Sequence, residues 1–263
     1  KVLVSRMLGY LRAIVRFIGF IFLCSYYVIE AFSRNLLFPK RLDAFHSSLK
    51  NWSIIVKKML GIEVEVFGEL PNEEVLLVPN HRSYIDIALL PPFFTTVYVA
   101  KAEVKSWPII GQGAQAARTI WVQRDSAKSR RETREAISKR LAQGFSVVVY
   151  PEGTTTKAPD LKEFRPGMFY RAAEGNIPVV PVALEYGEIN DSWVGSDTFI
   201  PHFLQCFRKR KTYVRMTIGP VMRDTEGERL RSSAENWVRN RLREHREAFG
   251  MAETEQILTQ KSN

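Results

Sequence analysis

From Gly61 onward, short runs of apolar and β-branched residues alternate with longer stretches of helical character. We interpret the short runs as strands at residues 63–67, 74–79, 97–101, 119–124, 145–150, 177–184 and 213–218. Helical stretches between them include 126–143 and 228–247, and the first of these stops at Gly144. Such alternation predicts an α/β fold in which a mixed, largely parallel sheet is flanked by helices. The strict alternation at 63–67 is typical of an edge strand.

Residues 1–60 have a different character. Residues 17–29 form an uncharged apolar run, shorter than the roughly 20 residues that a membrane span needs. Apolar side chains then recur every three or four residues over 42–59, which indicates an amphipathic helix. Basic residues flank the apolar run on both sides, so both ends favour the anionic, cytoplasmic face of a membrane. We therefore predict a membrane-associated helical pair, turned near Pro39, that dips into one leaflet. A buried helical hairpin and a single membrane span are the alternatives.

This contrast predicts a helical hairpin at 1–60 and one catalytic domain at 61–263. The hydrophobic content of 45% is enough for a sizeable core.

The chain is basic. Lys and Arg number 38 against 28 Asp and Glu, a net charge of +10, which favours an anionic partner such as nucleic acid, a phospholipid surface or a phosphorylated substrate. The two cysteines and four histidines form no metal-binding or disulfide pattern, so we expect no metal site.

The most informative short stretch is Asn80 to Asp86, which follows the apolar run 75–79. On a continuous helix, His81 and Asp86 would be about 500° apart and would not share a face. His81 must therefore lie in the turn before a helix that begins near Ser83, so that one ring nitrogen can meet Asp86. A carboxylate on one nitrogen orients the imidazole and lets the other nitrogen act as a general base. The alternative is that Asp86 caps the helix and His81 is an ordinary turn residue.

Three further stretches follow strands or form one. The carboxyl ends of parallel strands gather at one edge of a sheet, so His81, Arg124 and Glu152 are expected near each other. Taken alone, Arg124 reads as a solvated residue at a strand end, and Tyr150 to Thr154 reads as a turn. The prolines within 177–184 restrict the pairing of that strand and favour a place in a pocket wall.

Taken together and in this order, these stretches resemble the motifs of the glycerolipid acyltransferase family, which includes the 1-acylglycerol-3-phosphate acyltransferases. The resemblance covers about residues 61–220. The matching blocks are N-H-x-x-x-x-D at Asn80 to Asp86, a glycine-to-arginine block at Gly111 to Arg124, aromatic-P-E-G-T at Tyr150 to Thr154, and I-P-V-x-P-V at Ile177 to Val182.

The resemblance implies that His81 is the general base and Asp86 its orienter. The expected reaction moves a fatty acyl group from a thioester of coenzyme A or acyl carrier protein to the hydroxyl of 1-acyl-glycerol-3-phosphate, giving phosphatidic acid. The thioester is a co-substrate, and no cofactor is implied. The expected partners are membrane lipids, the lysophospholipid acceptor and the thioester carrier, without nucleic acid. The residues assigned to acceptor binding are Arg124, Glu152, Gly153 and Thr154, and Lys101 is a further candidate for the same pocket.

One departure from the family pattern affects the acceptor. Family members that use phosphate-bearing acceptors often continue E-G-T with arginine, whereas this chain has Thr155 and Thr156 before Lys157. Either Lys157 supplies the missing cation, or the acceptor's headgroup is not a simple phosphate. A lyso-aminolipid such as lyso-ornithine lipid is therefore an alternative acceptor.

Other classes of function fit the sequence less well. The basic cluster 208–211 suits a non-enzymatic module that binds membranes or nucleic acid, but few aromatic residues accompany it and no nucleic-acid motif does. A metal-dependent phosphohydrolase also uses His and Asp, but the remaining histidines are poorly placed as further ligands.

Overall fold

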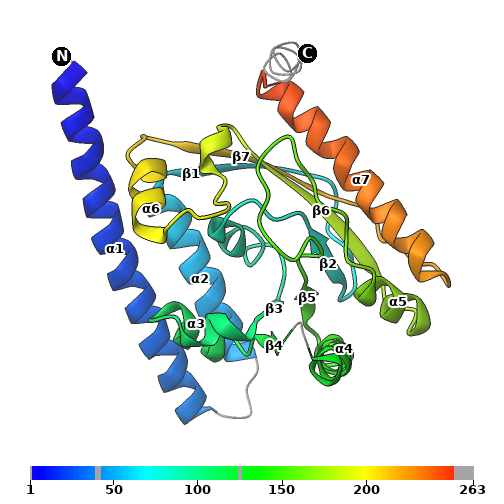
Figure 1. Ribbon diagram of the computed structural model, residues 1–263. Coiled ribbons are helices and arrows are strands. Elements are labelled where there is room, and N and C mark those ends of the chain that lie inside the picture. Colours follow the sequence, from blue (N-terminus) through cyan, green and yellow to red (C-terminus); the bar gives the residue numbers. More distant parts are fainter. Residues whose placement is uncertain (1, 39–42, 124–125, 252–263) are drawn as a thin grey trace.

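The computed structural model describes residues 2–38, 43–123 and 126–251 and shows a sheet flanked by helices (Figure 1). Within these residues the sheet has seven strands, in the order β1-β7-β6-β2-β5-β3-β4. The strands are β1 (Ile62–Phe67), β2 (Leu76–Pro79), β3 (Thr96–Lys101), β4 (Ile120–Val122), β5 (Ser146–Val148), β6 (Val179–Tyr186) and β7 (Thr212–Ile218). Each corresponds to one of the runs expected from the sequence.

All neighbouring strands pair in parallel except β6 and β7, which are antiparallel. The predicted fold class, a mixed and largely parallel sheet with flanking helices, is therefore confirmed, and β1 lies at an edge as its alternation predicted. β2 lies in the interior of the sheet, and its side chains enter two hydrophobic clusters alternately. Leu76 and Val78 belong to one cluster, whereas Val75 and Leu77 belong to the other. The loops that follow β2, β3 and β5 leave the same edge of the sheet, because these strands run in parallel.

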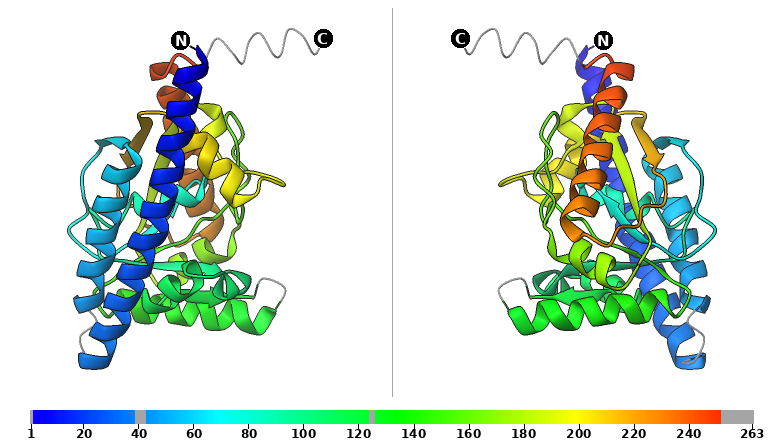
Figure 2. Two further views of the ribbon diagram at one scale, coloured as in Figure 1. Left: turned by 90° about the vertical axis from the view of Figure 1, so that its left-hand side faces the viewer. Right: turned by 90° about the vertical axis from the view of Figure 1, so that its right-hand side faces the viewer.

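Helices cover both faces of the sheet. The α-helices are α1 (Val2–Leu37), α2 (Asp43–Leu60), α3 (Ile110–Ala116), α4 (Ala127–Leu141), α5 (Gly167–Glu174), α6 (Phe199–Phe207) and α7 (Gly227–Ala248). Three short 3₁₀-helices are η1 (Tyr84–Ala88), η2 (Ala102–Ser106) and η3 (Ile189–Asp191). α1 and α2 lie on one side of the molecule and α7 on the opposite side (Figure 2). The helices expected at 126–143 and 228–247 correspond to α4 and α7.

The N-terminal region contains two helices that pack against each other, as expected, although the turn near Pro39 lies outside the described residues. α1 is much longer than the uncharged run at 17–29, because it continues without a break over 36 residues. Its part Val4–Leu37 is long and apolar enough to cross a membrane, judged by length and composition. The argument that this segment is too short to span was therefore wrong. Arginine is a good helix former, so the basic residues before position 17 prolong the helix instead of ending it.

α1 is docked along the rest of the fold. α1 contacts three other helices, which are α6, α2 and α3. The Arg16 guanidinium donates to the carbonyl oxygens of Phe207 at 3.0 Å and Lys209 at 2.6 Å. The Phe17 and Phe20 rings lie 5.3 and 5.4 Å from the ring of Phe203. Opposite these contacts, α1 exposes large apolar side chains, among them Val4, Met7, Leu11, Val15, Ile18, Phe22, Ile29 and Leu36.

α2 belongs to the core of the sheet. Val56 and Leu60 are buried in the same hydrophobic cluster as Val182 and Leu184 of β6. The helical pair is therefore packed onto the domain, and no free linker separates α2 from β1. The division into segments 1–60 and 61–263 stays a prediction.

Candidate active site

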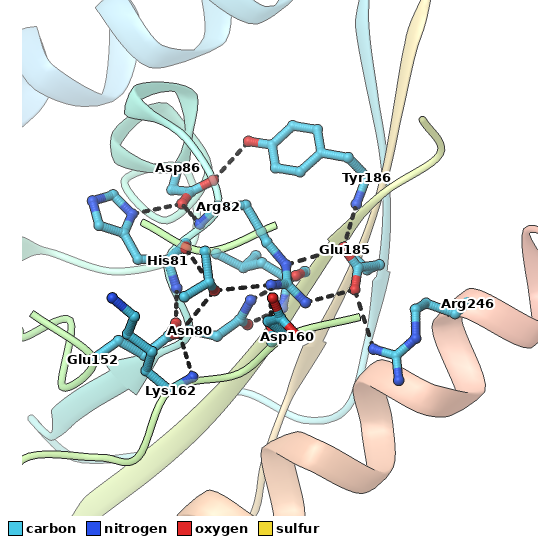
Figure 3. Close-up of polar contacts among 12 residues, drawn as sticks. Asn80, His81, Arg82, Asp86, Glu152, Asp160, Lys162, Glu185, Tyr186 and Arg246 are labelled. Carbon is cyan, nitrogen blue, oxygen red and sulfur yellow. Dashed lines mark hydrogen bonds and ion pairs between the residues drawn. The ribbon is translucent and has the colours of Figure 1, made fainter. Parts of the chain in front are cut away.

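The turn after β2 is fixed to β6 by one asparagine side chain (Figure 3). The amide nitrogen of Asn80 donates to the carbonyl oxygen of Leu184 at 2.9 Å, and the Leu184 N–H donates to the Asn80 amide oxygen at 2.7 Å. This pair of bonds continues the β2–β6 pairing beyond the end of β2 at Pro79. The turn that carries His81 therefore begins from a position set by the register of the sheet.

His81 and Asp86 meet in the way that their spacing predicted. His81 lies in the turn, η1 begins at Tyr84, and Nδ1 of His81 is 2.8 Å from Oδ2 of Asp86. The same oxygen accepts the backbone N–H groups of Arg82 at 2.7 Å and Ser83 at 3.0 Å. Asp86 is fully buried. It therefore closes the start of the short helix and also orients the imidazole, so the two interpretations of the sequence apply together.

Two tyrosines complete the surroundings of this pair. The Tyr186 hydroxyl donates to the other oxygen of Asp86, Oδ1, at 2.6 Å. Burial, and then the charge of Asp86, raise the pKa of Tyr186 well above its ordinary value, so the phenol keeps its proton and stays a donor. The His81 ring stacks on Tyr150, with 3.9 Å between the ring centres. With Nδ1 engaged by Asp86, Nε2 is the nitrogen of His81 that is left for a substrate.

Glu152, which the family resemblance assigned to acceptor binding, lies behind His81. One of its oxygens accepts the His81 N–H at 2.7 Å. The other accepts the Thr156 hydroxyl at 2.8 Å and the Lys162 N–H at 3.0 Å. Burial raises the pKa of Glu152, and these donated hydrogen bonds act in the opposite direction. In this arrangement the carboxylate positions the backbone of His81.

Arg82, the residue after His81, is fully buried. Its Nε and Nη2 donate to the two carboxylate oxygens of Glu185 at 3.1 and 2.8 Å. Its Nη1 donates to the Thr156 hydroxyl at 2.9 Å and to the Asp160 carbonyl oxygen at 2.6 Å. A bidentate, fully hydrogen-bonded pair of this kind holds the turn against β6 and the loop after β5.

Sequence reasoning did not find Arg82, Glu185 or Tyr186. One signal was present, since Glu185 is a charged residue directly after the apolar run 177–184. A carboxylate in a strand that is otherwise buried needs a partner, and an arginine within the catalytic motif is an obvious candidate.

A cavity of about 660 Å³ opens in front of His81. It runs between α1, α2 and α3, and its apolar walls include Phe20, Val28, Leu49, Trp52, Ile110 and Phe199. Gly153, Thr154 and Thr155 line it together with His81. Within the described residues, the run 177–184 does not line this cavity, so the expectation that it forms a pocket wall was wrong. That strand holds Asn80 from behind instead.

The sequence profile of the family described as Acyltransferase matches residues 61–185. The matched segment contains the His81–Asp86 pair, Glu152 and both partners of the Arg82–Glu185 ion pair. Over residues 61–185 this chain has the sequence of an acyltransferase-family domain. The resemblance found from the short motifs is thereby confirmed.

Individual acyltransferases show how far the similarity extends. A lyso-ornithine lipid O-acyltransferase from Pseudomonas aeruginosa is 31% identical over 172 residues, which cover 64% of this chain and 66% of the relative. A 1-acyl-sn-glycerol-3-phosphate acyltransferase from Neisseria gonorrhoeae is 33% identical over 128 residues, 48% of this chain and 50% of the relative. The chain thus spans just under two thirds of the first relative and half of the second.

The crystal structure of the 1-acyl-sn-glycerophosphate (LPA) acyltransferase PlsC from Thermotoga maritima has the same fold. The TM-score is 0.68 at 21% sequence identity, and the match covers 90% of this chain and 98% of that chain.

The other residues that the family resemblance assigned to acceptor binding do not all lie in the cavity. Lys101, at the end of β3, lines the cavity, as do Gly153 and Thr154. Lys157 is not among the described residues that line it, and its ammonium donates to the Asn190 side-chain oxygen at 3.2 Å. Arg124 lies outside the described residues.

The described part of the chain contains no group of three His, Cys, Asp or Glu side chains that could hold a metal ion.

Proposed function

We propose that this protein is a lipid O-acyltransferase that transfers a fatty acyl group from a thioester of coenzyme A or acyl carrier protein to the free hydroxyl of a lysolipid. The observation that carries this proposal is the oriented His81–Asp86 pair at the wall of a large apolar cavity. The matched acyltransferase profile over the same residues supports it.

The geometry suits direct transfer without an acyl-enzyme. Nε2 of His81 accepts the proton of the lysolipid hydroxyl while the oxygen attacks the thioester carbonyl carbon. Asp86 accepts the Nδ1–H of His81 and stabilises the imidazolium that forms. The tetrahedral intermediate then loses the thiolate, which takes the proton back from Nε2. The products are an ester and a free thiol, and His81 returns to its starting state.

The apolar part of the cavity suits the acyl chain. Phe20 and Ala31 of α1 both line it, and a helix rises roughly 16 Å between two such positions. A groove of this length between α1, α2 and α3 can shield a fatty acyl chain from water while its thioester stays near His81.

The charges around the cavity favour an anionic headgroup. Lys101, Arg134 and Arg165 line it, and the described lining residues include no Asp or Glu. We therefore propose 1-acyl-glycerol-3-phosphate as the acceptor. Lyso-ornithine lipid is the second candidate, favoured by Thr155 in place of the usual arginine and by the similarity to the lyso-ornithine lipid O-acyltransferase of Pseudomonas aeruginosa.

The deciding experiment is an acyl-transfer assay with purified protein. Labelled acyl-CoA and acyl carrier protein thioesters are each offered with lysophosphatidic acid or lyso-ornithine lipid, and the ester product is measured. We expect transfer to lysophosphatidic acid to be the fastest. Efficient transfer to lyso-ornithine lipid alone would change the acceptor and leave the mechanism intact. Thioester hydrolysis without transfer to either lysolipid would overturn the proposed function.

We further propose that α1 and α2 hold the enzyme in one leaflet on the cytoplasmic face. One face of α1 exposes apolar side chains, and the opposite face packs against α6, α2 and α3. Lipid cannot surround a helix that is docked in this way, so a leaflet-embedded pair fits better than a span.

Thiol labelling tests this topology. Ser5→Cys lies near the start of α1 and Ser233→Cys on α7, and both positions are exposed. The native Cys24 and Cys206 are buried, so their background labelling is low. In sealed vesicles that present the catalytic domain outward, we expect a membrane-impermeant reagent to label both variants. Labelling of Ser5→Cys only after permeabilisation would show that α1 crosses the bilayer.

A further inference from the structure

The turn after β5 leaves room for an arginine. Gly153 has a backbone φ of +73°, a conformation that residues other than glycine rarely adopt. A Cβ atom placed on Gly153 would lie 2.7 Å from Nε and 2.9 Å from Cζ of Arg165. The Arg165 guanidinium therefore lies directly across Gly153, and the positive φ favours glycine at this turn.

The backbone of Arg165 is held firmly while its charge is left exposed. The Arg165 N–H donates to the Pro151 carbonyl oxygen at 3.0 Å, and the preceding Phe164 is fully buried. The side chain of Arg165 lines the same cavity as His81. Its guanidinium forms no hydrogen bond or ion pair with the part of the chain that the structure describes.

Two backbone donors follow Gly153 directly in the sequence. Neither the Thr154 nor the Thr155 N–H donates a hydrogen bond within the described ranges, and both residues line the cavity. A guanidinium offers five donors and no acceptor. A concave site with several unpaired donors and no described carboxylate in its lining suits an anionic group.

We propose that Arg165 binds the anionic oxygens of the acceptor's headgroup, and so supplies the cation that Thr155 does not. The ligand group is the phosphate of a lysophosphatidic acid or the carboxylate of a lyso-aminolipid, since a guanidinium fork fits either. Arg165 is in this role a specificity-determining residue, which holds the headgroup while the acceptor's hydroxyl reaches His81. This inference rests on the proposed function.

The kinetic test uses Arg165→Ala and Arg165→Lys. For Arg165→Ala we expect the KM for the acceptor to rise roughly 10- to 150-fold, while the KM for the acyl thioester stays within about twofold. Arg165→Lys keeps the charge without the fork and should recover part of the loss. The matched control is Arg171→Ala on α5, whose guanidinium pairs with Glu174 at 3.6 Å outside the cavity lining, and it should behave as wild type.

Direct binding separates this inference from the proposed function. Lysophosphatidic acid and lyso-ornithine lipid are titrated calorimetrically, below their micelle concentrations, into wild type and Arg165→Ala without thioester. Weaker binding of either lysolipid to the variant supports the inference, and the lysolipid affected identifies phosphate or carboxylate as the ligand. Equal affinity of both lysolipids for the two proteins would overturn it, even if acyl transfer is observed. If wild type transfers to neither lysolipid, the proposed function fails, and the binding result still decides the role of Arg165.

Discussion

The two sides of the catalytic turn differ in how their charges are used. Behind His81, the charged groups of Arg82, Glu152 and Glu185 are buried and hydrogen-bonded to one another or to the backbone. In front of it, the Arg165 guanidinium faces the cavity without a partner in the described chain. The bonded side fixes the position of the imidazole, and the unpaired side is available to a ligand. This division separates residues that set geometry from residues that set specificity.

The largest effect on turnover is expected at His81, which lies between the two sides. His81→Ala should lower kcat roughly 10²- to 10⁴-fold, because a positioned general base is lost. The side chain is about one fifth exposed and bonds only to Asp86 among the described residues, so thermal unfolding should change little. Turnover above about a tenth of wild type in a correctly folded variant would show that another group acts as the base.

Two arginines provide a matched comparison of the two sides. Arg82→Met leaves the buried carboxylate of Glu185 without its bidentate partner and should lower the free energy of unfolding by about 3–5 kcal/mol. Arg165→Ala removes an exposed charge and should change that free energy by less than about 0.5 kcal/mol. Urea unfolding of both variants measures the difference. Equal losses in the two variants would contradict the division between a structural and a ligand-binding side.

A smaller effect on kcat should follow from removing the Tyr186 hydroxyl, which donates to Asp86. Tyr186→Phe removes the 2.6 Å hydrogen bond to Oδ1 and leaves the bonds to Oδ2 in place. A hydrogen bond to a charged group contributes on the order of 1.5 kcal/mol, so kcat should fall roughly tenfold with little change in either KM. Steady-state kinetics against both substrates tests this. A rise in the acceptor KM at unchanged kcat would place Tyr186 in binding rather than in positioning.

The smallest effect is expected at Lys157. Its ammonium bonds to Asn190, and the residue is not among those described in the cavity lining. Lys157→Ala should therefore leave the KM for either acceptor within about twofold, because exposed substitutions away from a site cost little. A tenfold rise would assign the headgroup cation to Lys157 and weaken the role proposed for Arg165.

Local patterns in the sequence were enough to predict the strands and the pairing of His81 with Asp86. Each strand is a short apolar run bounded by turn residues, and five-residue spacing leaves few ways for the two side chains to meet. The extent of α1 was not predictable in this way, because Arg16 reads as the end of an apolar run. In the fold its guanidinium donates to carbonyl oxygens at and just after the end of α6.

Contacts between residues far apart in the sequence also could not be predicted from local sequence patterns. The prolines of the run 177–184 suggested restricted pairing, yet β6 pairs on both sides, and the Pro181 carbonyl oxygen accepts the Gly219 N–H at 2.9 Å. Arg82 and Glu185 are 103 residues apart, and nothing in the periodicity around either residue identifies the other. Thr155 did mark the headgroup site as unusual, but the position of Arg165 over Gly153 depends on the fold.

The two hydrogen bonds between Asn80 and Leu184 join residues 104 positions apart, and the hydrogen bond between Tyr186 and Asp86 joins residues 100 positions apart. A ribosome adds about 5–20 residues per second, so the second partner is made roughly 5–20 s after the first. During that interval the nascent chain carries the whole N-H-x-x-x-x-D stretch without the strand that orients it. The imidazole therefore becomes a positioned base late in synthesis, when most of the sheet has been translated.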